Sequence, residues 1–161
     1  IDGGAGDDVI TGGAGVDTIT LGTGDNTVVQ SGTIGVADHN DSITGFTVTS
    51  DKLQFTGANI GDGNTTLTFT KAAAGSAAAL SELNVFTTAL ANDAAVVTEI
   101  QKVTSTTPTL YLVYNNADAS AQVWYDADSN VNGGETQLMQ LPGVAAGDLA
   151  NVTGANFVEL I

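Results

Sequence analysis

Glycine and aspartate recur at a fixed spacing near the start of the chain. A nine-residue unit, Gly-Gly-x-Gly-x-Asp-x-aliphatic-x, occupies residues 3–11 and again residues 12–20. A third, imperfect copy over residues 21–29 has Asn26 in place of the aspartate. Carboxylates and backbone carbonyls can together supply the roughly six to eight oxygen ligands that Ca²⁺ prefers, and glycine lets the backbone turn so that carbonyls approach one ion. The chemistry that this pattern indicates is calcium binding.

Each unit also has one aliphatic position, which predicts a short strand with its side chain facing inward. Stacked turns would bury these side chains in a continuous column and leave the aspartates on the outer turns. Without a cation the carboxylates would repel one another, so metal binding and folding are expected to be one event. The alternative interpretation, a flexible Gly-rich linker, does not account for two consecutive copies in the same phase.

The nonapeptide resembles the repeats of RTX proteins, which form a parallel β-roll that binds calcium. In that family two repeats make one coil, so turns that face the same ion lie two repeats apart. The resemblance implies that Asp8 and Asn26 face one ion. The carbonyl ligands that it implies for this first site are those of Gly4 and Gly6 beside Asp8, and those of Leu21 and Thr23 beside Asn26.

By the same resemblance a second site is expected at Asp17, with the carbonyls of Gly13 and Gly15. Its partner turn would fall at residues 30–35, where the repeat is no longer recognisable. A later acidic residue would then have to supply the missing ligand. The two candidates for that ligand are Asp38 and Asp41.

The segment after the repeats is similar to the one that ends the β-roll in RTX proteases, lipases and S-layer proteins. There the order is roughly Asp-x-Ile-x-Asp-Phe, followed by Asp-Lys-Leu or Asp-Lys-Ile and an alternating strand. Residues 41–46 and 51–53 match this order, with Gly45 in place of the second Asp. Alternating apolar residues predict short strands here, with a turn at residues 49–51. We interpret His39 as a solvated loop residue, since a zinc site would need further His or Cys ligands.

The middle of the chain predicts helices. Apolar residues at an i, i+1, i+4, i+7 spacing indicate a helix over residues 93–104, which Asn92 or Asp93 would cap. A shorter helix is predicted over residues 82–90, and a strand over residues 65–70.

The final third predicts four strands, over residues 109–114, 122–126, 136–141 and 157–160. Aromatic residues fall on the first two of them. We expect these rings to form cross-strand pairs within a sheet, and a carbohydrate-stacking platform is the alternative. The aromatic residues concerned are Tyr111, Tyr114, Trp124 and Tyr125.

A second acidic loop begins at Asp126 and continues with Asp128 and Asn130, a spacing that is typical of a calcium loop. An EF-hand would need Gly at its sixth and Glu at its twelfth position. Val131 and Gln137 hold those positions, so the loop is not an EF-hand. Calcium binding at this loop and a plain polar hairpin turn both remain open.

The end of the chain is similar to that of proteins exported by type I secretion. These often close with a Tyr-Asp-x-Asp hairpin, a strand, a Leu-x-Gly-Val-like turn and a terminal aromatic-aliphatic strand, an order that residues 125–161 follow. The resemblance thus covers most of the chain and implies the C-terminal module of a larger RTX protein. Ile1 sits where the aliphatic residue of an earlier repeat would fall, so we expect a longer array.

The implied fold is all-β with a minor helical insert at about residues 76–104. A short parallel β-roll over residues 1–37 would be capped by a β-sandwich-like region over residues 38–161. The resemblance implies Ca²⁺ as cofactor, the type I secretion machinery as partner during export, and a secreted or cell-surface location. The alternative is a surface-anchoring or self-assembly module of an S-layer protein or biofilm adhesin, which would associate with itself or contact the cell surface.

Composition narrows the function classes further. The formal net charge is −15, and the positive side chains are lysines without any arginine. This balance argues against nucleic acid and against anionic membranes, whose phosphates need cationic partners. No cysteine is present, no stretch is apolar enough to enter a bilayer, and no nucleophile motif is recognisable, so we do not expect an enzyme.

Overall fold

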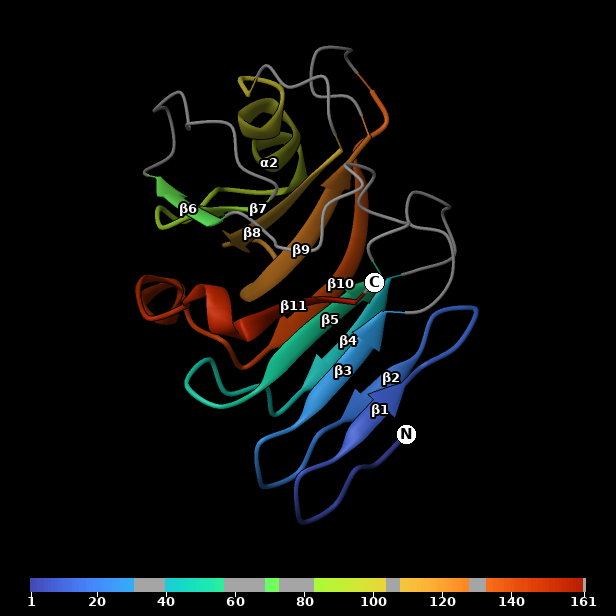
Figure 1. The fold of residues 1–161 in the computed structure, drawn as a ribbon. Coiled ribbons are helices and arrows are strands. Elements are labelled where there is room, and N and C mark those ends of the chain that lie inside the picture. Colours follow the sequence, from blue (N-terminus) through green and yellow to red (C-terminus); the bar gives the residue numbers. More distant parts are fainter. Residues whose placement is uncertain (31–39, 57–68, 73–82, 104–107, 128–132, 161) are drawn as a thin grey trace.

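A computed structural model of the chain describes residues 1–30, 40–56, 69–72, 83–103, 108–127 and 133–160 (Figure 1). In these residues the fold is mostly β-strand, with one α-helix and two short 3-10 helices, which confirms the all-β class. The strands are β1 (Val9–Thr11), β2 (Thr18–Thr20), β3 (Thr27–Gln30), β4 (Asp41–Thr44), β5 (Lys52–Thr56), β6 (Phe69–Ala72), β7 (Leu83–Phe86), β8 (Thr109–Asn115), β9 (Ser120–Asp126), β10 (Thr136–Pro142) and β11 (Phe157–Leu160). The helices are α2 (Asp93–Ile100), η1 (Ala146–Ala150) and η2 (Gly154–Asn156).

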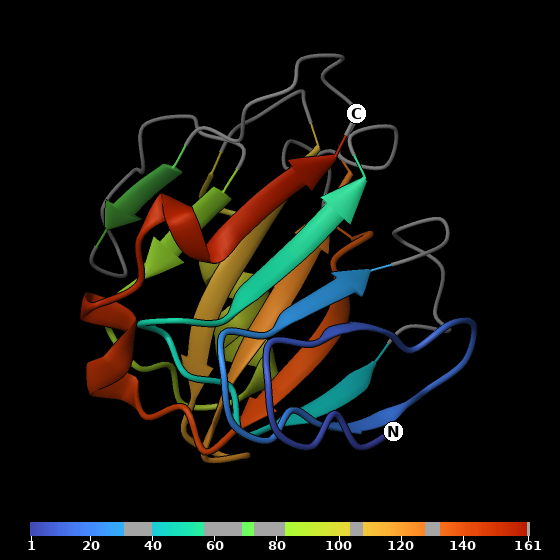
Figure 2. The same ribbon diagram turned by 60° about the horizontal axis from the view of Figure 1, so that its bottom comes forward.

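The smaller of the two sheets is parallel throughout and has the order β1-β3-β5-β11. Figure 2 shows β3, β5 and β11 side by side and pointing the same way, in blue, green and red. The strands that lie between them in the sequence, β2 and β4, belong to the other sheet. This alternation between two sheets is consistent with the β-roll that the repeats imply.

The larger sheet has the order β2-β4-β10-β9-β8-β7-β6. Its strands are parallel from β2 to β10 and from β8 to β6, and antiparallel at β10-β9 and β9-β8. Strands from the end of the chain therefore extend both roll sheets, β10 beside β4 and β11 beside β5. The division at residues 37 and 38 and the sandwich-like character of the cap stay predictions.

The main core lies between the two sheets. β1 and β2 each bury only the central residue of three, which is the inward position expected from the repeat. The rings of Phe55 and Phe157 stack at a centroid distance of 6.5 Å and join β5 to β11. The aliphatic column that starts in the repeats and continues through the later strands consists of Ile10, Ile19, Val28, Ile43 and Leu53.

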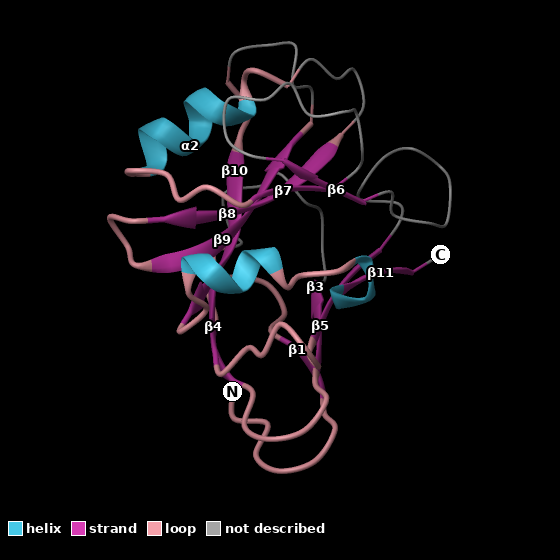
Figure 3. Cartoon of the chain, turned by 90° about the vertical axis from the view of Figure 1, so that its left-hand side faces the viewer, coloured by secondary structure: helices cyan, strands magenta, loops and turns pink. Residues whose placement is uncertain are grey.

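The helix α2 covers the opposite face of the larger sheet (Figure 3). Asn92 caps its start, because the side-chain Oδ1 accepts a hydrogen bond from Ala95 N at 3.0 Å. Val96 and Ile100 are buried against aromatic side chains of β7, β8 and β9. The predicted helix is therefore confirmed, and it ends at Ile100.

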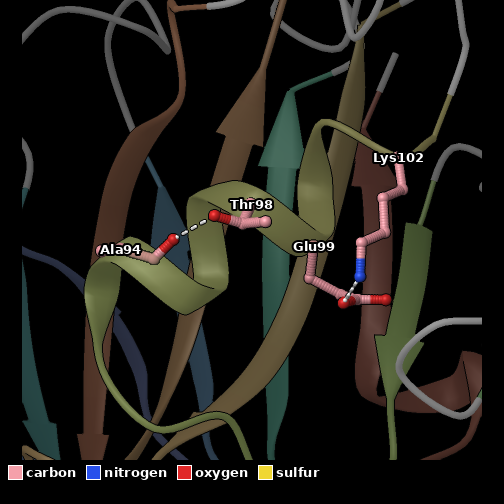
Figure 4. Close-up of polar contacts among 4 residues, drawn as sticks. All are labelled: Ala94, Thr98, Glu99 and Lys102. Atoms are coloured by element: carbon pink, nitrogen blue, oxygen red, sulfur yellow. Dashed lines mark hydrogen bonds and ion pairs between the residues drawn. The ribbon is translucent and has the colours of Figure 1, made fainter.

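Two polar contacts hold this helix (Figure 4). Thr98 Oγ1 donates to Ala94 O at 2.7 Å. Lys102 Nζ lies 2.6 Å from Glu99 Oε2, so the largely buried carboxylate has a cationic partner. No helix among the described residues is long and apolar enough to cross a membrane.

The helix predicted over residues 82–90 is wrong, since Leu83–Phe86 form β7. All four side chains of β7 are buried, because the larger sheet packs on the roll on one face and on α2 on the other. Such a strand lacks alternation and cannot be distinguished from a buried helix by periodicity. The four strands of the final third are confirmed, and Tyr111 lies directly opposite Trp124 inside the sheet.

Candidate metal centre

The turns of residues 3–8 and 21–26 stack on one another. Thr23 N donates to Gly4 O at 2.9 Å, and Gly6 N donates to Thr23 O at 2.9 Å. The strands that follow, β1 and β3, pair in the same register. One coil therefore spans two repeats in this chain.

The stacking requires glycine in the third, imperfect repeat. Gly22 has φ +83° and Gly24 has φ +124°, in the left-handed region that glycine adopts without strain. A Cβ atom at Gly22 would collide with the carbonyl oxygen of Gly4, and one at Gly24 with that of Gly6. The missing side chains let the two turns approach until their backbones form hydrogen bonds with each other.

A column of Asp and Asn residues runs along this edge of the smaller sheet. Asp8, Asn26, Asp51 and Asn156 each stand directly before a strand of that sheet, and we call them the first column. Asp8 N donates to Asn26 Oδ1 at 3.1 Å, and Asn26 N donates to Asp51 Oδ1 at 2.8 Å. The structure thus brings Asp8 and Asn26 together, as the repeat spacing predicts. The repeat spacing does not predict that Asp51 belongs to the first column. The signal that could have identified it is its position just before a predicted strand.

A second column lies at the opposite end of the repeat strands. Asp17 stands before β2, and its backbone N donates to Asp41 Oδ1 at 2.8 Å. Of the two predicted partners the structure places Asp41 beside Asp17, while Asp38 lies outside the described residues. Gly13 and Gly15 both have positive φ, and a Cβ on either would meet no atom within 4 Å.

Each column contains a buried carboxylate oxygen without a donor. Asp8 Oδ2 and Asp17 Oδ2 are both buried and have no hydrogen-bond partner. Backbone approaches both of them closely, since a Cβ on Gly3 would lie 3.1 Å from Asp8 Oδ2 and one on Gly12 would lie 2.7 Å from Asp17 Oδ2. A buried charge without a partner is costly, and a cation at either place would remove that cost.

The available donors are oxygens. In the part of the chain that the structure describes, no three His, Cys, Asp or Glu side chains gather to hold a metal. An ion here would therefore rely on paired side-chain oxygens together with backbone carbonyls, which suits calcium and not zinc. The residues present fit Ca²⁺, and the individual ligands remain predictions. The carbonyls predicted for the first site, those of Gly4, Gly6, Leu21 and Thr23, lie in the stacked turns, where Gly4 O and Thr23 O accept backbone hydrogen bonds from Thr23 N and Gly6 N.

The third predicted site lies at the end of β9. Asp126 is 1% exposed, and Asp128 and Asn130 lie outside the described residues. Burial raises the pKa of Tyr125, and the negative charge of Asp126 raises it further. Calcium binding at this loop stays a prediction.

The comparison with protein families bears on the N-terminal turns. Residues 1–28 match the family model of the RTX calcium-binding nonapeptide repeat, which contains four copies. This segment is an RTX repeat array. RTX nonapeptide repeats bind calcium, in agreement with the chemistry of the two columns. No curated protein and no solved structure matched the chain.

Proposed function

We propose that this chain is the calcium-binding module of a secreted RTX protein and that it folds when it meets extracellular Ca²⁺. The observation that carries the proposal is the pair of buried oxygens, Asp8 Oδ2 and Asp17 Oδ2, which have no donor. They lie in turns built from RTX repeats. Bound Ca²⁺ supplies the positively charged partner that these two carboxylate oxygens lack.

Two side-chain pairs hold the ions in this proposal. Asp8 and Asn26 share the first ion, and Asp17 and Asp41 share the second, each with carbonyls of the adjoining turns. Because the unfolded chain has neither pair, binding stabilises the coil by mass action.

The proposal extends to export. Calcium is scarce in the cytosol, so the repeats stay unfolded there and the chain passes through the type I secretion machinery with its C-terminal end first. The strand region that ends with β11 carries the export signal. We propose no catalytic step for this chain, whose single histidine and lack of cysteine and arginine leave few groups for one.

A calcium titration tests the proposal. We expect far-ultraviolet circular dichroism of the chelator-treated chain to show a cooperative gain of β-structure as Ca²⁺ is added. In isothermal titration calorimetry Asp8→Ala and Asp17→Ala should each lose an ion relative to the parent chain. Asp25→Ala is the matched control, because Asp25 is an exposed aspartate in the same turn as Asn26. An unchanged spectrum together with no binding heat at millimolar Ca²⁺ would sink the proposal.

A second role, self-assembly or surface anchoring, has one observation in its favour. Ile1, Val9 and Val16 are 54%, 75% and 67% exposed on the first coil, whose strands β1 and β2 form the outer rim of the two sheets. If this rim mediates association, Val9→Ser with Val16→Ser should abolish a calcium-dependent increase in mass measured by analytical ultracentrifugation. A parent chain that stays monomeric with and without calcium would exclude the role for this segment.

A further inference from the structure

Three pairs of residues in the two columns are joined by the same kind of hydrogen bond from a backbone N–H, and we call each pair a rung. The rungs are Asp8–Asn26, Asp17–Asp41 and Asn26–Asp51. In each, the backbone N–H of the earlier residue donates to Oδ1 of the later one, at 3.1, 2.8 and 2.8 Å. The rungs are therefore equivalent positions, and they can be compared atom by atom.

They differ at the second side-chain atom of the earlier residue. In Asp8 and Asp17 that atom is a buried carboxylate oxygen without a partner. In Asn26 it is the amide Nδ2, which donates to Gly24 O at 3.3 Å and to Asp51 Oδ1 at 3.3 Å. Gly24 precedes Asn26 by the same two positions by which Gly6 precedes Asp8. The amide thus contacts a turn carbonyl and the side-chain oxygen of the next coil.

The orientation of this amide is fixed by its surroundings. Asn26 Oδ1 accepts the hydrogen bond from Asp8 N, so a flipped amide would place donor against donor. The opposing carboxylate is also satisfied, because Asp51 Oδ2 accepts from Thr47 N at 2.7 Å. Asn26 and Asp51 are both 1% exposed, and their rung holds a buried carboxylate without needing a cation.

We propose that Asn26 ends the cation column by substituting an amide for the ion. The N–H groups of Asn26 take the part between Gly24 O and Asp51 that Ca²⁺ takes one coil earlier. This inference rests on the proposed calcium function, and it makes residue 26 the position at which the first column stops binding ions.

Two reciprocal substitutions test the assignment. Asn26→Asp replaces the amide with a carboxylate facing Asp51, so calorimetry should detect an additional Ca²⁺ ion per chain. In chelator its midpoint of thermal unfolding should fall below that of the parent. Asp8→Asn gives the Asp8–Asn26 rung the amide that the Asn26–Asp51 rung already has, so it should lose an ion, and its unfolding midpoint in chelator should rise.

Asp25→Ala is the control, since Asp25 is an exposed aspartate beside Asn26. It should keep both the ion count of the parent and its unfolding midpoint in chelator. Equal ion counts for Asn26→Asp and the parent, or an unfolding midpoint of Asp8→Asn in chelator that does not rise, would overturn the assignment of the amide. If the parent itself binds no calcium, the proposed function fails. The measurements in chelator still decide whether an amide stabilises the rung, so the two failures are distinguishable, even if Asn26→Asp does not fold.

Discussion

The first coil and the C-terminal strands achieve burial in different ways. β1 and β2 are short strands that each bury one side chain, and their turns are built from glycines with positive φ. β9 buries all seven of its residues, between the roll on one face and α2 on the other. Hydrophobic burial is the main source of folding free energy, so β9 and its neighbouring strands can be stable without ions, whereas in our proposal bound ions add the stability that the small core of the coil lacks.

Among the substitutions that test this comparison, one at Trp124 is expected to have the largest effect on stability. Its ring is 6% exposed in the cluster under α2, and Nε1 donates to Gln122 Oε1 at 2.8 Å. Trp124→Ala should lower the free energy of unfolding by about 3–5 kcal/mol, because it leaves a cavity and an unpaired amide. Urea unfolding followed by circular dichroism should give the same loss in calcium and in chelator. A loss confined to chelator would contradict the division between the two regions.

A smaller effect, confined to the coil, is expected from Gly22→Ala. The new Cβ would collide with Gly4 O, and φ at this position is +83°. Overpacking and the strained backbone should together cost about 2–4 kcal/mol, and calorimetry should show weaker calcium binding.

Gly13→Ala is the matched control for that substitution. Its φ is +105°, but a Cβ there would meet no atom within 4 Å, so only the backbone strain of about 1–2 kcal/mol is expected. Equal losses for the two variants would mean that the stacking of turns does not require glycine at position 22.

The pairing between the repeat turns could be predicted from the sequence, and the pairing beyond the repeats could not. Asp8 and Asn26 lie 18 positions apart, which is two repeats, and the resemblance to RTX repeats implies that two repeats make one coil, so it brings these residues together. Asn26 and Asp51 lie 25 positions apart, and Asp17 and Asp41 lie 24 apart, so the later coils no longer keep the period. Spacing therefore left two candidate partners for Asp17 and gave no sign of Asp51.

The same limit applies to the sheets. The strand of residues 157–160 could be predicted from its composition, but its place beside β5 depends on a contact between Phe157 and Leu53 that is distant in sequence. Local patterns carry no information on such a pairing, and they also misassigned the doubly buried β7 as helix. The sequence does specify the turns of the repeats, because the roles of glycine and aspartate in a turn depend only on neighbouring residues.

The smallest expected effect is on stability at alkaline pH, and it again distinguishes the coil from the C-terminal strands. Burial, and then the charge of Asp126, raise the pKa of Tyr125 from its usual value of 10.0. Since the folded state holds the phenol neutral more strongly than the unfolded chain does, this stabilising contribution is complete below pH 10.0 and is lost as the pH rises through the folded pKa. Tyr125→Phe should remove that part of the alkaline loss, as judged from urea unfolding midpoints above and below pH 10.0. The comparison is made in chelator, where no cation can offset the charge of Asp126. Because Tyr125 lies in β9, the difference between the two proteins should persist there, and a difference that vanishes in chelator would tie β9 to the ion-dependent coil.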